Sequence, residues 1–272
     1  MLESRGFSVR MTHAVVGDGY KLPTWLGSLH GIVPVDVGVG LRDFGDTPRA
    51  IGSVIAISKR ADIISFLDAD NWFSSDHCVE VLAAHRASSA PVVSATRSFY
   101  NFVGEPLEAN CLTSNGKDFI DTNCLNLFGE ACSLALKWCS IDPEEHAIDD
   151  RVIFDFVRQS GVVVQHIPVA TVCYRATVAS IYTDLGETPP KEAKNNDRIS
   201  KAVRHFENRT GRSAALSWRY EIPINAISRV LKLVAAMRKR GKQEQAERLL
   251  AETLKQLPAF QRQILESAIV LR

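Results

Sequence analysis

The stretch Ile63-Ile64-Ser65-Phe66-Leu67-Asp68-Ala69-Asp70 decides the fold. Its five leading residues are almost all apolar, which is typical of a buried strand in a parallel sheet. Two carboxylates, one residue apart, follow at the end of that strand. They repel each other unless a proton or a cation lies between them. Because open α/β sheets bind ligands at the carboxyl ends of their strands, the stretch predicts a site, with a divalent metal on phosphate oxygens.

Elements on either side of this stretch alternate between strand and helix. Apolar, β-branched runs predict strands over 9–16, 32–39 and 91–95. A helix is predicted over 48–59, with Thr47 at the N-cap and Pro48 at the first helical position. Another helix starts after Ser74 or Ser75 and continues to about residue 85. The alternation predicts an α/β fold: a mostly parallel sheet with helices on both faces.

The pattern changes in the second half of the predicted domain, which spans 1–182. Residues 99–117 are polar and glycine-containing, which indicates an antiparallel excursion or a loop. The later elements are strands over 119–127, 162–167 and 171–174, and helices over 129–138 and 149–159, the last ended by Gly161.

A linker or mobile loop is predicted over 183–197, followed by a helical extension over 198–272. Helices are predicted there over 198–208, 224–240, 243–257 and 260–270. From residue 224 onward ten Lys and Arg face four Glu, a net charge of +6 that leaves −5 for the rest of the chain. Two interpretations stay open. The basic helices are a solvated face, which we favour, or they bind a protein partner or mediate oligomer formation.

Composition narrows the class of protein. The chain has 272 residues with 46% hydrophobic and 23% charged residues, and its net charge of +1 gives no argument for nucleic-acid binding. Its six cysteines form no CxxC pair, so we expect a reducing compartment without disulfides. No signal peptide and no apolar run of about 18 residues is visible, so the expectation is a cytoplasmic protein without a membrane span.

Four short motifs together carry a resemblance to a known family. Residues 46–53, Asp46-Thr47-Pro48-Arg49-Ala50-Ile51-Gly52-Ser53, and the following 61–71 resemble the central segment of GT-A glycosyltransferases, and more narrowly the inverting family 2 type with its DxD motif. Val15-Val16-Gly17-Asp18-Gly19 resembles that family's second strand and turn. Asp149-Asp150-Arg151 resembles the acidic pair that supplies the catalytic base. The resemblance covers about residues 9 to 180, with the motifs in the family's order.

The resemblance implies a Rossmann-like GT-A fold and a metal-dependent transfer of a sugar, with inversion, from a nucleotide-diphosphate sugar to a carbohydrate or other hydroxyl acceptor. It implies Mn²⁺ or Mg²⁺ as cofactor, bound by Asp70, with Asp68 as a second metal contact or on the ribose. Hard carboxylate oxygens suit these ions. Asp18 would then face the nucleobase or ribose, and Arg49 the nucleotide.

The remaining implied roles concern the reaction itself. Asp150, or its neighbour Asp149, would take the proton from the acceptor hydroxyl. Arg175, in a late strand, would contact a phosphate. Each residue also has a purely structural interpretation. The DxD carboxylates could stabilise a turn, the acidic pair could cap a helix, and Arg49 could form an ion pair.

Two alternatives to a transferase stay open. The family begins with an apolar strand that this sequence does not show ahead of residue 9, which favours a degenerate, non-catalytic GT-A-like binding or scaffold protein. A phosphatase of the haloacid dehalogenase type also places Asp-x-Asp at a strand end. There the motif usually lies near the N-terminus and is followed by Thr or Val, whereas Asn71 follows here.

Overall fold

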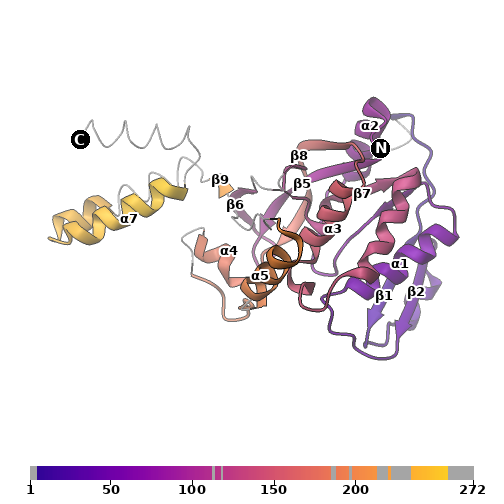
Figure 1. The fold of residues 1–272 in the computed structure, drawn as a ribbon, viewed down its shortest axis with the longest axis horizontal. Helices are drawn as coiled ribbons and strands as arrows, with labels where there is room; N and C mark the ends of the chain where they lie inside the picture. The colour runs from indigo at the N-terminus through magenta and orange to yellow at the C-terminus, as the bar shows by residue number, and fades with distance from the viewer. Residues whose placement is uncertain are drawn as a thin grey trace.

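The computed structural model describes residues 5–111, 114–117, 119–184, 188–195, 198–212, 220–221 and 234–256 (Figure 1). In chain order the strands and helices are β1 (His13–Asp18), η2 (Thr24–Ser28), β2 (Ile32–Val37), α1 (Asp46–Ser58), β3 (Ile63–Ser65), β4 (Trp72–Phe73), α2 (His77–Ser88), β5 (Val92–Tyr100), β6 (Pro106–Cys111), η3 (Thr122–Cys124), β7 (Leu125–Phe128), η4 (Gly129–Ser140), η5 (His146–Ile148), α3 (Asp149–Gln159), β8 (Val164–Arg175), α4 (Ala179–Asp184), α5 (Arg198–Thr210), β9 (Tyr220–Glu221) and α7 (Gln243–Gln256).

The strands form two separate sheets. β1 and β2 pair in parallel, from His13 opposite Ile32 to Asp18 opposite Val37. Helix α1 packs on this pair through the face that carries Gly52: a Cβ there would lie 3.7 Å from the Cβ of Ala14, an ordinary contact distance. The larger sheet has the order β3-β7-β5-β6-β9, with β8 pairing with both β5 and β4.

The α/β class is confirmed, and the larger sheet is mixed rather than uniformly parallel. β5 and β8 run parallel, whereas β7 lies between β3 and β5 and runs antiparallel to both. The strand expected over 63–67 is therefore shorter, covering 63–65, and its neighbour within the described residues is antiparallel. β3 and β5 still point the same way, because both run antiparallel to β7, and the long connection that contains α2 allows this. The sequence does not reveal that β7 inserts between them.

Helices cover both faces of the larger sheet, as expected. Neighbouring residues of β5 point to opposite faces. Val92 belongs to the main core, which also contains Trp138 of η4 and Val157 of α3. Val93 belongs to a smaller core with Val81 of α2 on the other face. Figure 1 shows α1 beside β1 and β2, and α2 at the top of the view, near the N-terminus.

Several boundaries differ from the sequence prediction for identifiable reasons. Helix α1 begins at Asp46 behind Gly45, whose φ of 93° is left-handed, and not after Thr47. The capping is done from Asp43, which accepts hydrogen bonds from the amides of Gly45 at 3.2 Å and Thr47 at 2.9 Å. The helix predicted over 129–138 is a 3-10 helix, and the two late strands are one continuous strand, β8.

Other predictions are confirmed or fall outside the described residues. Helix α3 has the predicted bounds, with Gly161 in a left-handed conformation after it, and the excursion after residue 99 is the antiparallel pair of β5 and β6. Most of the helix predicted over 224–240 and all of that over 260–270 lie outside the described residues. In the described part of the chain, no helix has the length and apolar character needed to span a membrane.

Candidate functional site

Polar side chains from distant parts of the chain meet at one edge of the larger sheet. Asp68 follows the carboxyl end of β3. Because β7 runs in the opposite direction, its start lies beside the end of β3, and that start carries Asp121 and Asn123. The carboxyl end of β8, which is parallel to β5, brings Tyr174 to the same region. The antiparallel insertion of β7 thus adds polar residues to the predicted site.

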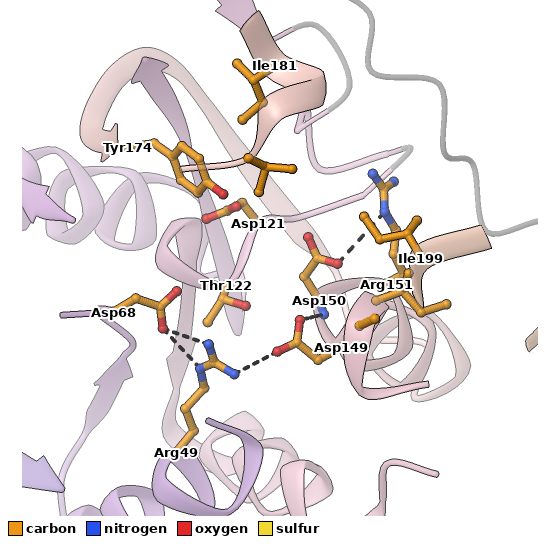
Figure 2. A pocket seen from close by; sticks show the side chains of 13 residues that line it. Arg49, Asp68, Asp121, Thr122, Asp149, Asp150, Arg151, Tyr174, Ile181 and Ile199 are labelled. Atoms are coloured by element: carbon orange, nitrogen blue, oxygen red, sulfur yellow. Dashed lines mark hydrogen bonds and ion pairs between the residues drawn. The ribbon is translucent and has the colours of Figure 1, made fainter. Parts of the chain in front are cut away.

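Arg49 is the centre of this group (Figure 2). Its Nη2 lies 2.7 Å from Oδ1 of Asp68, and its Nη1 lies 2.8 Å from Oδ2 of Asp149 and 3.2 Å from Oδ1 of Asp46. Burial opposes the charge of Arg49, but the three carboxylates outweigh it and raise the pKa, so the guanidinium stays protonated. The guanidinium carbon also lies 4.8 Å from the ring centroid of Trp138. Arg49 therefore holds three carboxylates in one place.

Asn123 connects the DxD motif to Asp121. Its Oδ1 accepts a hydrogen bond from the backbone amide of Asp68 at 2.7 Å, and its Nδ2 donates to Oδ2 of Asp68 at 3.1 Å. The same Nδ2 donates to Oδ1 of Asp121 at 3.1 Å. Asp121 is paired in turn with the buried guanidinium of Arg97. The orientation of Asp68 is thus fixed from two sides, by Arg49 and by Asn123.

Asp149 and Asp150 stand in the first turn of α3, where the helix N-terminus favours carboxylates. Both face the cavity shown in Figure 2. Burial raises the pKa of Asp149 to about 8, against the opposing effect of Arg49. Burial likewise raises the pKa of Asp150 to about 7, against the effect of Arg151, while Asp149 adds to the rise. Near neutral pH each carboxyl can therefore exchange a proton.

A second pair of side chains, His146 and Asp46, lies next to the ion pairs of Arg49. Nδ1 of His146 and Oδ2 of Asp46 share a hydrogen bond of 2.5 Å. Burial raises the pKa of Asp46, whose side chain is only 1% exposed, to about 7. Neither residue was among the predicted site residues. Asp46 lies in the quoted motif, three residues before Arg49, and that spacing on a helix was the available signal.

The cavity itself has a volume of about 140 Å³. Its polar lining comes from α1, the sheet edge and the start of α3, and its apolar lining from η5 and the segments around α4 and α5. The lining residues are Arg49, Asp68, Asp121, Thr122, Ala147, Ile148, Asp149, Asp150, Arg151, Tyr174, Val178, Ile181 and Ile199. Of the predicted site residues, Arg49, Asp68, Asp149 and Asp150 thus come together here.

Asp70 and Arg175 are not among the residues that line this cavity. The pairing of Trp72 with Cys173 brings them to the same end of β4 and β8. Burial raises the pKa of Asp70, and the charge of Asp68 adds to the rise, while Lys194 and Arg175 oppose it. Nε of Arg175 is buried and has no hydrogen-bond partner among the described residues. The carboxylate of Asp70 and the guanidinium of Arg175 are thus neighbours, close to Asp68.

Asp18 stands at the end of β1, in the smaller sheet, and does not line this cavity. Its Oδ1 accepts a hydrogen bond from the amide of Leu41 at 2.7 Å, which holds the loop after β2 against the turn after β1. The two segments approach closely, since a Cβ on Gly19 would lie 2.6 Å from the backbone nitrogen of Gly40. The contacts of Asp18 are those of a loop-stabilising residue.

The residues present fit a divalent cation that is completed by phosphate oxygens. Within the described residues, no group of three or more His, Cys, Asp or Glu side chains could hold a metal by itself. Mg²⁺, however, is commonly bound by one or two carboxylates together with substrate phosphates. Asp70 offers a carboxylate whose charge is disfavoured by burial and by Asp68, and a cation would relieve both effects.

Comparisons with known proteins give little further information. No model of a known protein family and no curated protein matches this chain. Among solved structures it is similar to S. aureus TarS 1-349 in complex with UDP, at 13% identity and a TM-score of 0.43, over 95% of this chain and 78% of that one. It is also similar to TarS 1-349 in complex with UDP-GlcNAc, at 12% identity and a TM-score of 0.38, over 91% and 72%.

Proposed function

We propose that this protein is a glycosyltransferase that moves a sugar from a nucleotide-diphosphate sugar to an acceptor hydroxyl, with inversion at the anomeric carbon. One observation carries the proposal: Asp68 of the DxD motif and the acidic pair Asp149 and Asp150 face one cavity. They come from distant parts of the sequence, and the resemblance assigned both to the reaction. A purely structural turn and a purely structural helix cap would have no reason to share a cavity.

The donor side of the proposed site consists of Asp68, Asp70 and Arg175. Asp70 and Asp68 would hold Mg²⁺ or Mn²⁺ together with the donor phosphates. When bound, the ion would stabilise the negative charge that develops on the leaving nucleotide. Arg175 is proposed to contact a phosphate on the resemblance alone, because its Nε is buried, although no described residue accepts a hydrogen bond from that atom. Asp18 is proposed for the nucleobase or ribose on the resemblance alone.

The acceptor side consists of the two carboxyls at the start of α3. Asp150 is the proposed general base because Arg49 holds Asp149 at 2.8 Å, whereas the ion pair of Asp150 with Nε of Arg151 is longer, at 3.9 Å. Asp150 accepts the proton of the acceptor hydroxyl as that oxygen attacks the anomeric carbon from the face opposite the nucleotide. The bond from carbon to acceptor oxygen forms, the bond to the diphosphate oxygen breaks, and the nucleoside diphosphate leaves with its electron pair.

Two observations favour a second candidate, the non-catalytic GT-A-like binding protein. Arg49 neutralises both Asp68 and Asp149 by direct ion pairs. The cavity of about 140 Å³ is also smaller than the roughly 300 Å³ or more typical of small-molecule sites. On this interpretation the carboxylates stabilise the fold and no donor binds.

Thermal unfolding with Mn²⁺ and a panel of UDP-, GDP- and TDP-sugars separates the two candidates. The transferase predicts stabilisation by one nucleotide-sugar in the presence of metal, and loss of that stabilisation in Asp70→Ala. Asp76→Ala, which changes an exposed acid before α2, is the matched control and should respond like the unchanged protein. Absence of a shift with every donor would favour the binding protein.

A further inference from the structure

Helix α5 belongs to the extension predicted from the sequence, yet it packs on the segment that leads to the acidic pair. Ala202 and Phe206 are 1% and 2% exposed and belong to the main core. Ile199, one turn earlier on the same side, lines the cavity. Figure 1 shows α5 beside α3 and α4. The helix is therefore a wall of the candidate site.

The strongest polar contact of α5 is with Glu145, whose side chain is completely buried. Nε and Nη2 of Arg209 donate to its two carboxylate oxygens at 2.8 Å and 2.6 Å, and Nδ1 of His205 lies 3.0 Å from Oε1. A buried carboxylate is unfavourable without such partners, and a two-pronged arginine contact also fixes its orientation. Glu145 is thus anchored to α5.

The residues after Glu145 lead directly into the site. The amide of Ile148 donates to the carbonyl of Glu145 at 2.9 Å, which closes the turn η5. Within that turn His146 contacts Asp46, and Ala147 and Ile148 line the cavity. Asp149 and Asp150 follow at once.

An arginine also contacts the other end of this segment, at Asp155 in α3. Nη2 of Arg212, just beyond α5, lies 2.6 Å from Oδ2 of Asp155, which is 8% exposed and belongs to α3. Gln159 donates to the same oxygen at 2.6 Å. Contacts from α5 and the residue pair after it therefore span the segment from Glu145 to Asp155.

We propose that Arg209 is a positioning residue: through Glu145 it sets the place of Asp149 and Asp150 in the cavity. The acidic pair then depends on a helix that the sequence assigns to a separate extension. This inference rests on the proposed function, because it concerns the same acidic pair. The inference assigns a role to Arg209, which lies far from the acidic pair in the sequence and would touch neither the substrate nor the metal.

The test compares full-length Arg209→Ala and Arg209→Lys with Lys201→Ala. Lys201 is the matched control: it lies on the same helix and pairs with Glu144 at 2.6 Å, but it is 69% exposed. Exposed ion pairs contribute little, so this variant should match the unchanged protein. Arg209→Lys keeps the charge and loses the two-pronged contact, so its effect should lie between the other two.

The first readout is steady-state kinetics. A displaced base costs turnover, about 100-fold for a shift near 1 Å, and leaves donor binding unchanged. We expect kcat to fall by about 10- to 100-fold in Arg209→Ala while KM for the donor changes less than about twofold. Unchanged kcat, or a loss that falls on KM alone, would overturn the inference.

The second readout does not require activity. Amide hydrogen exchange should quicken in Arg209→Ala over 145–151 and stay unchanged in β5. Faster exchange over the whole domain, or an unchanged exchange rate over 145–151, would overturn the positioning role. If Arg209→Ala does not fold, Arg209→Lys gives the same comparison. If the unchanged protein transfers no sugar from any donor, the proposed function fails, and the exchange result still decides whether Arg209 positions the acidic pair.

Discussion

Arg49 and Asp149 form an ion pair of 2.8 Å although 100 residues separate them in the sequence. The same guanidinium holds Asp68 at 2.7 Å, so one side chain links the DxD motif to the start of α3. This arrangement has a structural side and a chemical side. On the structural side, the positive charge of Arg49 allows several carboxylates to be buried together. On the chemical side, Arg49 forms an ion pair with Asp149 but has no direct contact with Asp150.

Replacing Arg49 should destabilise the fold more strongly at high pH than at low pH. In Arg49→Met, three carboxylates lose their shared cation, and removal of one partner from a buried ionic group typically costs about 3 to 5 kcal/mol. The repulsion requires ionised carboxyls, and the pKa values of Asp46 and Asp149 are raised to about 7 and about 8. Arg49 lowers both pKa values, so they rise further in the variant. We therefore expect a loss of stability that is much smaller near pH 5 than at pH 8.

Chemical denaturation at the two pH values measures this difference. Arg198→Met, at the exposed start of α5, is the control and should cost little at either pH. An equal loss of stability for Arg49→Met at pH 5 and pH 8 would contradict the carboxylate explanation.

Asp150→Asn should remove turnover and preserve donor binding. A general base contributes about 10²- to 10⁴-fold to the rate, and the amide cannot accept the proton. Product formation and titration calorimetry with the donor measure the two effects separately. If Asp149→Asn loses turnover instead, the base is Asp149; if neither does, the assignment of the base to α3 is wrong.

The rate of the unchanged protein should rise with pH to a plateau above about pH 7. The base must be ionised to accept a proton, and burial raises the pKa of Asp150 to about 7. A plot of log kcat against pH should have a slope near one on its acidic side. A rate that is constant from pH 5 to pH 8 would exclude a base with this pKa.

Asp150→Asn should also raise the stability of the fold, by an amount that grows as pH rises above about 4 and reaches its full size above about pH 7. The pKa of Asp150 is raised from 3.8 to about 7, so between these values the folded state binds a proton that the unfolded chain has released. The free energy of unfolding therefore falls as pH rises through this window. The uncharged amide in the variant removes the free-energy cost of ionising a buried carboxyl.

We expect the melting temperature of Asp150→Asn to exceed that of the unchanged protein by about 3 to 8 °C at pH 8, from a gain of about 1 to 3 kcal/mol. The two should agree near pH 4. Asp76→Asn, at an exposed position, is the control and should show no such dependence. A gain that is the same at both pH values would rule out the carboxyl as its source.

The turn after β1 provides a test of the fold itself. Gly19 has φ +72°, and an added Cβ would lie 2.6 Å and 2.7 Å from backbone atoms of Gly40. Gly19→Ala should therefore cost about 2 kcal/mol or more, measured by chemical denaturation. Gly38→Ala is the matched control, because its Cβ would meet no atom within 4 Å and its φ is not left-handed. Equal stability of the two variants would show that this turn is not tight.

The sequence by itself determined the local elements and the chemical character of the site. Apolar β-branched runs predicted most strands, the bounds of α3 were predicted correctly, and Asp68, Asp149 and Asp150 were singled out as site residues. These features depend on side-chain periodicity and on residue type, which neighbouring residues largely fix.

Only the tertiary structure decided which of these residues meet. The insertion of β7 between β3 and β5 brings Asn123 to Asp68, and the packing of α5 on the core brings Arg209 to Glu145. Strand order and helix docking depend on contacts between segments far apart in the chain, and short sequence patterns contain no record of them. The burial that raises the pKa of Asp150 arises from the same packing, so its proposed role as a base belongs to the fold as much as to the motif.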